Sequence, residues 1–298
     1  MISIDFLSFA RLAEIQIATW GFPQSLATSA IDYFVSFDPL EPDHTASFEH
    51  YNEQLVQFRR APPWYFYKED GLRNMDSPQE RRPYNPFHHQ LRAINRSRAN
   101  TNIYLIPQDP IKIHYTMNAM IEEILRQDPN GVVAILCPKK QREYLFNRFK
   151  MVAANNTSFS SDELGDRILL VPRTNGRFEF RRLLAMADVI LDSWPWGGWT
   201  TTLQALAAKT PVITLPGNDA RSRFTFGAYK TLGIDVFIAH NVEEFVHIAL
   251  RAARDKIWRH QAMAKIQATA VEKLFETPET VICWSDFLDR AIRLARFC

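Results

Sequence analysis

The sequence has 298 residues, of which 46% are hydrophobic and 23% charged, as is ordinary for a globular protein of one large or two medium domains. Its 35 basic and 33 acidic residues give a net charge of +2, so nothing in the charge favours binding to nucleic acid or an anionic membrane. Three widely separated cysteines indicate neither a disulfide framework nor a zinc site, and no apolar run is long enough to cross a membrane. The first residues lack the basic end and long apolar core of a signal peptide, so we expect a cytoplasmic protein.

The first 60 residues predict a small α/β region. Apolar runs at Ile15–Trp20, Tyr33–Phe37 and Leu55–Phe58 indicate strands, and Phe48–Leu55 is typical of a short helix. From residue 61 to 100 the composition shifts to Pro, Arg, Asn and aromatic residues without a regular period, which is typical of a linker or inserted loop. Paired arginines in and beside this stretch favour a solvated loop over a nucleic-acid patch, because the whole chain is nearly neutral.

From residue 101 short apolar strands alternate with amphipathic helices, which predicts a parallel sheet covered on both faces. Six strands are expected, at Ile103–Ile106, Val132–Leu136, Ile168–Val171, Val189–Leu191, Val212–Leu215 and Asp235–Ile238. Helices are expected near 117–125, 141–152, 180–187, 223–232, 242–253, 257–274 and 285–296, with another that starts near Thr200. Doubly wound sheets of this kind bind ligands beyond the carboxyl ends of their strands.

The turn between the strands at 189–191 and 212–215 is the main candidate site. Gly197 and Gly198 allow a close backbone approach, and Thr200 and Thr201 suit a helix start because their hydroxyls can accept from unpaired amides. The open amides and the partial positive charge of a helix start favour an anion. An ordinary strand–turn–helix connection without a ligand is an equally good interpretation of this pattern alone.

Further candidates lie at the same predicted edge of the sheet. Lys112 follows the first strand of this region and is placed to neutralise a leaving phosphate, although most lysines are simply solvated. Gln108 is placed to orient a sugar or phosphate or to cap its loop, and Arg223 is another possible anion partner or a surface ion pair. Trp199, with its neighbours Trp194 and Trp196, fits a sugar pocket or ordinary packing equally well.

The acidic and histidine residues predict no metal site. His88 and His89 are adjacent rather than at ligand spacing, and Asp188 and Asp192 lie four apart across a buried strand rather than as an Asp-x-Asp pair. No order of Ser, His, Asp or Cys residues points to a nucleophilic enzyme.

Taken together, the motifs resemble those of glycosyltransferase family 41, which contains protein O-GlcNAc transferases. In the first part the matching residues are Arg11 with Gln16, Trp20-Gly21-Phe22-Pro23, Ile31-Asp32-Tyr33 and Tyr51-Asn52-Glu53. In the second part they are Pro107-Gln108 with Lys112-Ile113-His114, Ala187-Asp188-Val189 through Leu191-Asp192, Gly197-Gly198, Thr200-Thr201, Pro211-Val212 to Gly217, Arg223-Phe224-Thr225 and Gly233-Ile234. The resemblance covers roughly residues 9–58 and 101–298, and the order of many short motifs makes it specific.

The resemblance implies a GT-B architecture with a UDP-sugar between two Rossmann-like lobes, one complete and the N-terminal one truncated. It implies inverting, metal-independent transfer of a hexose or N-acetylglucosamine to a protein side chain, with no cofactor. Lys112 corresponds to the family's essential lysine at the leaving diphosphate, and Gly198, Thr200 and Thr201 to its phosphate-binding helix start. The loop from Val171 to Phe180 corresponds to the uracil pocket. The expected partners are the UDP-sugar and a protein acceptor.

The sequence also departs from the family pattern. Gln204 stands where the family has an acid that holds the ribose hydroxyls, so the charge that favours a diol is lost. Only two or three strands are predicted before residue 101, where a Rossmann-like lobe needs about five. The alternative is therefore an inactive relative that binds UDP or a partner protein.

These observations predict four regions. Residues 1–60 form a partial acceptor-side lobe, 61–100 an irregular linker, and 101–282 the nucleotide-sugar lobe. Residues 283–298 form a C-terminal helix that packs back toward the first lobe.

Overall fold

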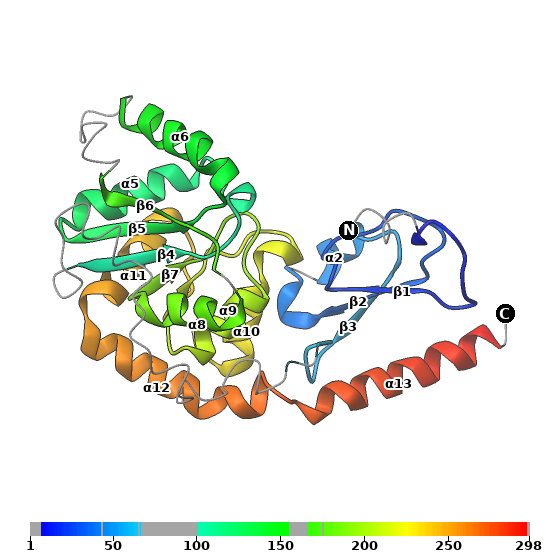
Figure 1. The fold of residues 1–298 in the computed structure, drawn as a ribbon. Coiled ribbons are helices and arrows are strands. Elements are labelled where there is room, and N and C mark those ends of the chain that lie inside the picture. Colours follow the sequence, from blue (N-terminus) through cyan, green and yellow to red (C-terminus); the bar gives the residue numbers. More distant parts are fainter. Residues whose placement is uncertain are drawn as a thin grey trace.

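A computed structural model describes residues 7–42, 44–64, 66, 101–154, 166–174 and 176–296. The chain forms a larger lobe around one parallel sheet and a smaller lobe around another, joined side by side (Figure 1). A last helix leaves the larger lobe and runs along the smaller one to the C-terminal end (Figure 1).

The larger lobe is a five-stranded parallel sheet in the order β6-β5-β4-β7-β8. Its strands are β4 (Asn102–Ile106), β5 (Gly131–Leu136), β6 (Ile168–Val171), β7 (Val189–Leu191) and β8 (Val212–Ile213). Its helices are α5 (Met117–Gln127), α6 (Arg142–Ala154), α8 (Arg177–Met186), α9 (Thr200–Ala207), α10 (Phe224–Leu232), α11 (Val242–Arg254) and α12 (Lys256–Lys273). Short 3-10 turns follow three of the strands: η3 (Pro110–Lys112), η4 (Lys139–Gln141) and η5 (Ala220–Ser222).

Both faces of this sheet are buried, which explains why its strands are continuous apolar runs. In β4, Ile103 and Leu105 belong to the core under α8 and α9, whereas Tyr104 and Ile106 belong to the core that includes α5 and α11. Successive side chains of a strand point to opposite faces, so a strand covered on both sides must be apolar throughout.

The predicted sixth strand at Asp235–Ile238 is wrong. This segment makes one isolated parallel bridge, Ile238 to Thr214, and β8 itself ends at Ile213 rather than Leu215. Gly233, in the left-handed conformation, ends α10, and the chain then pairs with Thr214 alone: Thr214 N donates to Phe237 O at 3.1 Å, and Ala239 N donates to Thr214 O at 2.8 Å. The pairing is too short to build a strand.

The smaller lobe has three parallel strands, β1 (Ile17–Thr19), β2 (Tyr33–Phe37) and β3 (Gln54–Phe58), in that order. The turn η1 (Asp38–Leu40) and the helix α2 (His44–Glu49) connect β2 to β3. The helix predicted at Phe48–Leu55 is misplaced, because Leu55 pairs with Phe34 in the sheet and both side chains are buried. Burial in the sheet therefore overrides the local helical pattern.

The last helix, α13 (Pro278–Ala295), lies against the smaller sheet. Trp284 Nε1 donates to Pro63 O at 2.9 Å, and the Phe287 ring meets Tyr33 and Phe58 with centroids 5.3 and 6.3 Å apart. It starts earlier than predicted, at Pro278, a residue type whose fixed φ suits a first helical turn. The division into four regions remains a prediction.

An aromatic seam joins the lobes. The ring of Trp199, at the start of α9, lies 3.8 Å from that of Trp64 and 5.8 Å from that of Trp20, centroid to centroid. Nearby, Leu40 of η1 packs on α10 at Gly227, where an added Cβ would come within 2.7 Å of it. One continuous core therefore runs through both lobes.

Candidate functional site

The order of the large sheet fixes where a ligand would bind. The chain builds outward from β4 through β5 to β6, then returns to place β7 and β8 on the other side of β4. The reversal between β4 and β7 leaves a crevice at their carboxyl ends, the usual ligand site of open α/β sheets. Gln108 and Lys112 follow β4, and the Gly197-Gly198 turn follows β7, so the predicted candidates meet at this switch point.

A buried acid, Asp192, shapes the glycine turn. Its carboxylate accepts hydrogen bonds from Gly198 N at 2.8 Å and from Thr214 Oγ1 at 3.0 Å, and its side chain contacts Gly197. Burial raises the pKa of Asp192, opposed by these hydrogen bonds and by the charge of Lys112. Asp192 therefore both holds the Gly197-Gly198 turn and attracts Lys112.

Helix α9 begins without a side-chain cap. Its cap residue is Trp199, and no side chain of the described residues accepts from its first amides. No described hydrogen bond joins the hydroxyls of Thr200 and Thr201 to these amides, and the Thr201 hydroxyl accepts from Gln108 instead. The hydroxyl of Thr202 donates back to Gly198 O at 3.0 Å and pairs with Thr225 at 2.8 Å. The helix start therefore keeps the open amides and partial positive charge of an anion site.

Gln108 is packed against this turn. Its side chain is 4% exposed and its Nε2 donates to Thr201 Oγ1 at 3.3 Å. Its Oε1 is buried without a hydrogen-bond partner in the described part of the chain. A Cβ added at Gly198 would overlap both Gln108 and Thr201, so only glycine allows this approach. A buried, half-satisfied amide beside an open helix start is a feature of a ligand site.

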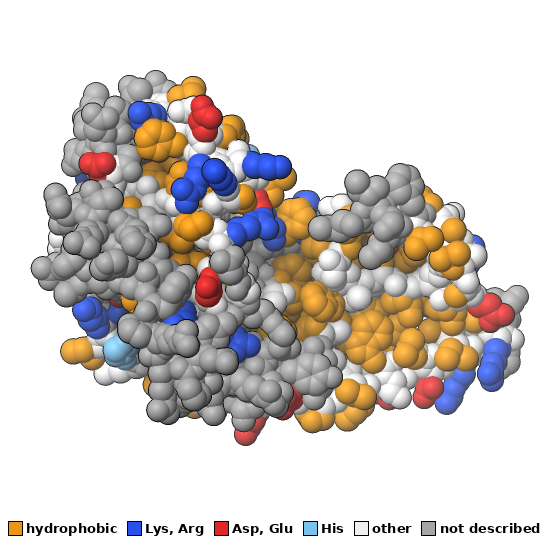
Figure 2. Space-filling model, in the orientation of Figure 1, with side chains coloured by type: hydrophobic (Ala, Val, Ile, Leu, Met, Phe, Trp, Pro, Cys, Tyr) orange, Lys and Arg blue, Asp and Glu red, His pale blue; other side chains and the backbone are white. Residues whose placement is uncertain are grey.

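Lys112 is half-buried at the other side of the crevice. Its Nζ lies 4.8 Å from the centroid of the Trp196 ring, which is 40% exposed. Burial lowers the pKa of Lys112, and the charges of Asp192 and Asp109 act in the opposite direction. The space-filling view shows lysine and arginine side chains gathered on the large-lobe wall of the notch between the lobes (Figure 2). The wall suits an anion.

Other predicted residues lie apart from this cluster. Trp199 is buried against Trp20, Trp64 and Phe224, so its ring is part of the lobe seam, and its role in binding the sugar stays a prediction. Arg223 donates to Gly217 O at 3.2 Å and lies over the Phe226 ring, and no described contact joins it to Lys112.

Phe180 and Gln204 remain predictions. Phe180 lies in the first turns of α8 rather than in the loop after β6, and its side chain packs against the core on this side of the sheet. Gln204 is buried one turn after Thr200, on the same face of α9 and near the open helix start.

Two residues of the site were not predicted from the sequence. Asp192 belongs to the motifs that resemble the family but was not predicted as a site residue, yet an acid directly after a buried strand and just before a Gly-Gly turn can accept from the turn amides. Arg221, in η5, lies with its Cζ 5.8 Å from the Trp196 ring centroid, and its carbonyl accepts from Gly197 N at 3.0 Å. No local sequence pattern pointed to it.

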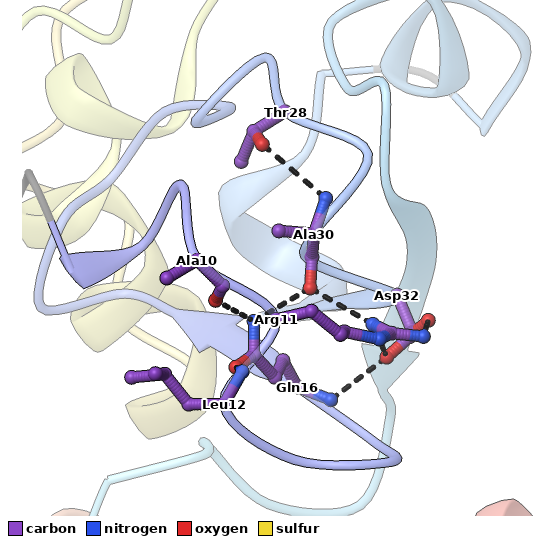
Figure 3. Close-up of polar contacts among 7 residues, drawn as sticks. All are labelled: Ala10, Arg11, Leu12, Gln16, Thr28, Ala30 and Asp32. Carbon is purple, nitrogen blue, oxygen red and sulfur yellow. Dashed lines mark hydrogen bonds and ion pairs between the residues drawn. The ribbon is translucent and has the colours of Figure 1, made fainter.

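The smaller lobe brings two of its sequence motifs together in one network (Figure 3). Arg11 donates twice to the carboxylate of Asp32, at 2.7 and 2.8 Å. Gln16 N donates to the same carboxylate at 2.7 Å, and the Gln16 side chain bonds to Ala30 O at 2.6 Å. A groove of about 960 Å³ lies beside it, between this loop and the end of α13. The network holds the loop before β1 and lies outside the crevice between β4 and β7.

In the described part of the chain no three His, Cys, Asp or Glu side chains gather into a possible metal centre. None of its helices has the length and apolar character needed to cross a bilayer.

Comparison with known families decides the assignment. The model of "Glycosyl transferase family 41" matches residues 100–282, which is more than half of the chain. The chain belongs to glycosyl transferase family 41. The matched segment contains both arms of the crevice, from Gln108 to the helix start at Thr200.

The family 41 chain is similar to plant proteins of much greater length. It is 23% identical over 248 residues to the petunia protein named "Probable UDP-N-acetylglucosamine--peptide N-acetylglucosaminyltransferase SPINDLY". It is 28% identical to the tomato protein of that name and 27% identical to the Arabidopsis protein named SEC. Each match covers 82% of this chain but only 23 or 24% of the relative, so the chain spans about a quarter of their length.

Solved structures establish the fold of the family 41 chain. A variant of the O-GlcNAc transferase of Thermobaculum terrenum superposes with a TM-score of 0.73 at 21% identity, over 96% of this chain and 49% of that one. HepE of Anabaena, in complex with UDP and glucose, superposes with a TM-score of 0.54 at 12% identity, over 88% of this chain and 71% of that one. The architecture is of GT-B type, as predicted.

Proposed function

We propose that this chain carries the donor site of a glycosyltransferase that moves a hexose or N-acetylglucosamine from a UDP-sugar to a protein side chain. The observation that carries the proposal is the meeting of Lys112, Gln108 and the open start of α9 at the switch point of the sheet. The plant relatives are named as UDP-N-acetylglucosamine–peptide transferases, which supports this donor and acceptor.

In this reaction the bond between the sugar carbon C1 and the diphosphate oxygen breaks, and UDP leaves with the electron pair. The acceptor oxygen forms its bond to C1 from the opposite face, which inverts the configuration, and its proton passes to a base. Lys112 and the amides at the start of α9 lie where the negative charge of UDP develops. They supply the positive charge that would otherwise require a divalent metal ion.

The remaining predicted contacts concern the nucleoside. Gln204, buried on the face of α9 that carries Thr200, is placed to hydrogen-bond the ribose hydroxyls. We assign the uracil to the side of the crevice where β6 ends and α8 begins, with Phe180 in the first turns of α8.

A second candidate function is UDP binding without turnover. It is favoured by Gln204, an amide where the family pattern has an acid, and by the smaller lobe, whose described residues form three strands.

One experiment separates these functions. UDP, UDP-glucose, UDP-galactose and UDP-N-acetylglucosamine are tested for thermal protection and for release of free sugar or transfer to protein. Protection by UDP with turnover of one donor supports the transferase, and protection without turnover supports the binding function. If UDP does not protect the chain at millimolar concentration, both are wrong.

A further inference from the structure

Arg221 has contacts that a simple surface arginine would not need. Its side chain is 35% exposed, and its guanidinium lies 5.8 Å from the centroid of Trp196, the same ring on which Lys112 rests. Two cations therefore share one half-exposed indole at the mouth of the crevice. Cation–π attraction holds each of them without using up its N–H donors.

The same residue reaches the other lobe. Arg221 Nη1 donates to Gln24 Oε1 at 3.2 Å, across 197 positions of sequence. The loop of Gln24 is fixed to the smaller lobe, because Glu53, 5% exposed, accepts from Ser25 Oγ and Leu26 N at 2.8 Å each. If Gln24 moves relative to the site, either the Arg221 side chain moves with it or the Arg221–Gln24 hydrogen bond breaks.

The backbone of Arg221 also contacts the Gly197-Gly198 turn. Its carbonyl accepts from Gly197 N at 3.0 Å, next to the residue whose amide Asp192 holds. Arg221 thus contacts the Gly197-Gly198 turn, the Trp196 ring and the loop of Gln24 in the smaller lobe.

The charge around Arg221 leaves it available to an anion. Its Nη2 pairs with Asp219 Oδ2 at 2.9 Å, but this acid is 39% exposed, and pairs of this kind contribute little stability. A guanidinium has five N–H donors, so it can exchange such a partner for a diphosphate oxygen without losing the contact to Gln24.

We propose that Arg221 is a second phosphate-binding cation, which ties the acceptor-side loop at Gln24 to the occupancy of the donor site. The inference rests on the proposed function, because it takes UDP as the ligand. When the diphosphate binds, Arg221 shifts its pairing from Asp219 to a phosphate oxygen and keeps Gln24 in place. Arg221 therefore affects both the position of the Gln24 loop and the affinity for UDP.

The test measures UDP affinity by calorimetry in Arg221→Ala, Arg221→Lys, Gln24→Ala and Asp219→Asn. Arg221→Ala is expected to weaken UDP binding about tenfold, the effect of one charge-assisted hydrogen bond, and Arg221→Lys to recover part of it. Gln24→Ala is expected to weaken UDP binding about two- to threefold in the wild-type background and to have no added effect beside Arg221→Ala.

Asp219→Asn gives the discriminating result. Asp219 Oδ1 accepts from Ser222 N at 3.1 Å, and asparagine keeps this cap while it removes the competing charge. UDP binding should therefore tighten by about two- to fivefold, whereas a purely structural ion pair predicts no gain. The matched control is Arg126→Ala, which removes one surface arginine from an ion pair with Glu123 on α5.

The two proposals fail separately. If wild-type protein binds UDP and Lys112→Met weakens it, but Arg221→Ala and Asp219→Asn leave the affinity within twofold, the role of Arg221 is wrong and the donor site stands. If the effects of Gln24→Ala and Arg221→Ala simply add, the coupling is wrong. If wild-type protein does not bind UDP, the proposed function falls together with this inference.

Discussion

Replacing Lys112 with methionine is the most direct test of the donor site. Methionine keeps an apolar side chain of similar length and removes the ammonium, whose Nζ lies 4.8 Å from the Trp196 ring centroid. A charge-assisted hydrogen bond contributes about 1.5–3 kcal/mol, so UDP should bind about 10- to 150-fold more weakly. Turnover should fall further, by about 10²–10³, because the charge on the leaving diphosphate is largest in the transition state.

The assay is UDP titration by calorimetry, followed by donor consumption at saturating UDP-sugar. Lys140→Met is the matched control, because Lys140 is an exposed lysine of the same lobe. Equal UDP affinity in wild type, control and Lys112→Met would refute the reasoning, since the ammonium would then not contact the diphosphate.

The pH dependence gives an independent test of the same lysine. Burial lowers the pKa of Lys112 below its usual 10.5, so its charge is lost as pH rises through that lower value. UDP affinity should therefore decline on the alkaline side before pH 10.5. Asp192 raises the pKa of Lys112 by charge attraction, so Asp192→Asn should move this decline to lower pH. A decline that does not move would place Lys112 outside the reach of Asp192.

Three further predictions concern other residues. Gly198→Ala should weaken UDP binding about tenfold or more, because the new Cβ displaces Gln108 and Thr201, both at the site. The melting temperature should fall only modestly. A calorimetric titration measures the UDP affinity and a thermal melt measures the stability. Gln204→Glu should tighten binding of UDP about threefold but not that of 2′,3′-dideoxy-UDP, because only a ribose diol gains from the charge; equal effects on both ligands would contradict the ribose contact. Arg11 holds the pKa of Asp32 below its usual 3.8, so this pair stabilises the fold above that range and stops doing so as pH falls through the lowered value. Thermal melts should accordingly show Arg11→Ala as destabilising at pH 6, and progressively less so as the pH falls below 3.8.

Much of the larger lobe was predictable, because its strands are apolar runs between clear breaks. Its strands at Ile168–Val171 and Val189–Leu191 have the predicted bounds, and so has the strand at Tyr33–Phe37 in the smaller lobe. The helix predicted at Phe48–Leu55 was misplaced because a residue elsewhere in the chain decides the structure: Leu55 is extended since it pairs with Phe34 in the sheet. The segment at 235–238 is apolar enough for a strand, but it meets the sheet at a single residue.

The candidate site was predictable only in part. Gln108, Gly198 and Thr201 come together because they follow strands that are neighbours in the sheet, and the ends of parallel strands share one edge. Trp199 looked equally suited to a sugar pocket, but its ring meets Trp64, 135 positions earlier in the sequence, in the seam. Local sequence carries no information about such a partner. The same holds for Arg221 and Gln24, whose contact depends on how the lobes dock.

The seam limits how the two lobes can move during a reaction. Lobes joined by small polar interfaces rotate freely, whereas a large apolar interface holds them. Here the core is continuous from Phe37 and Trp64 through Trp199 to Phe224, and Leu40 fits a gap that only glycine leaves in α10. Opening this interface would expose several aromatic side chains, at about 25 cal/mol for each Å² of apolar surface. Adjustment to a donor is therefore expected in the partly exposed side chains at the rim, such as Arg221, which touches both lobes.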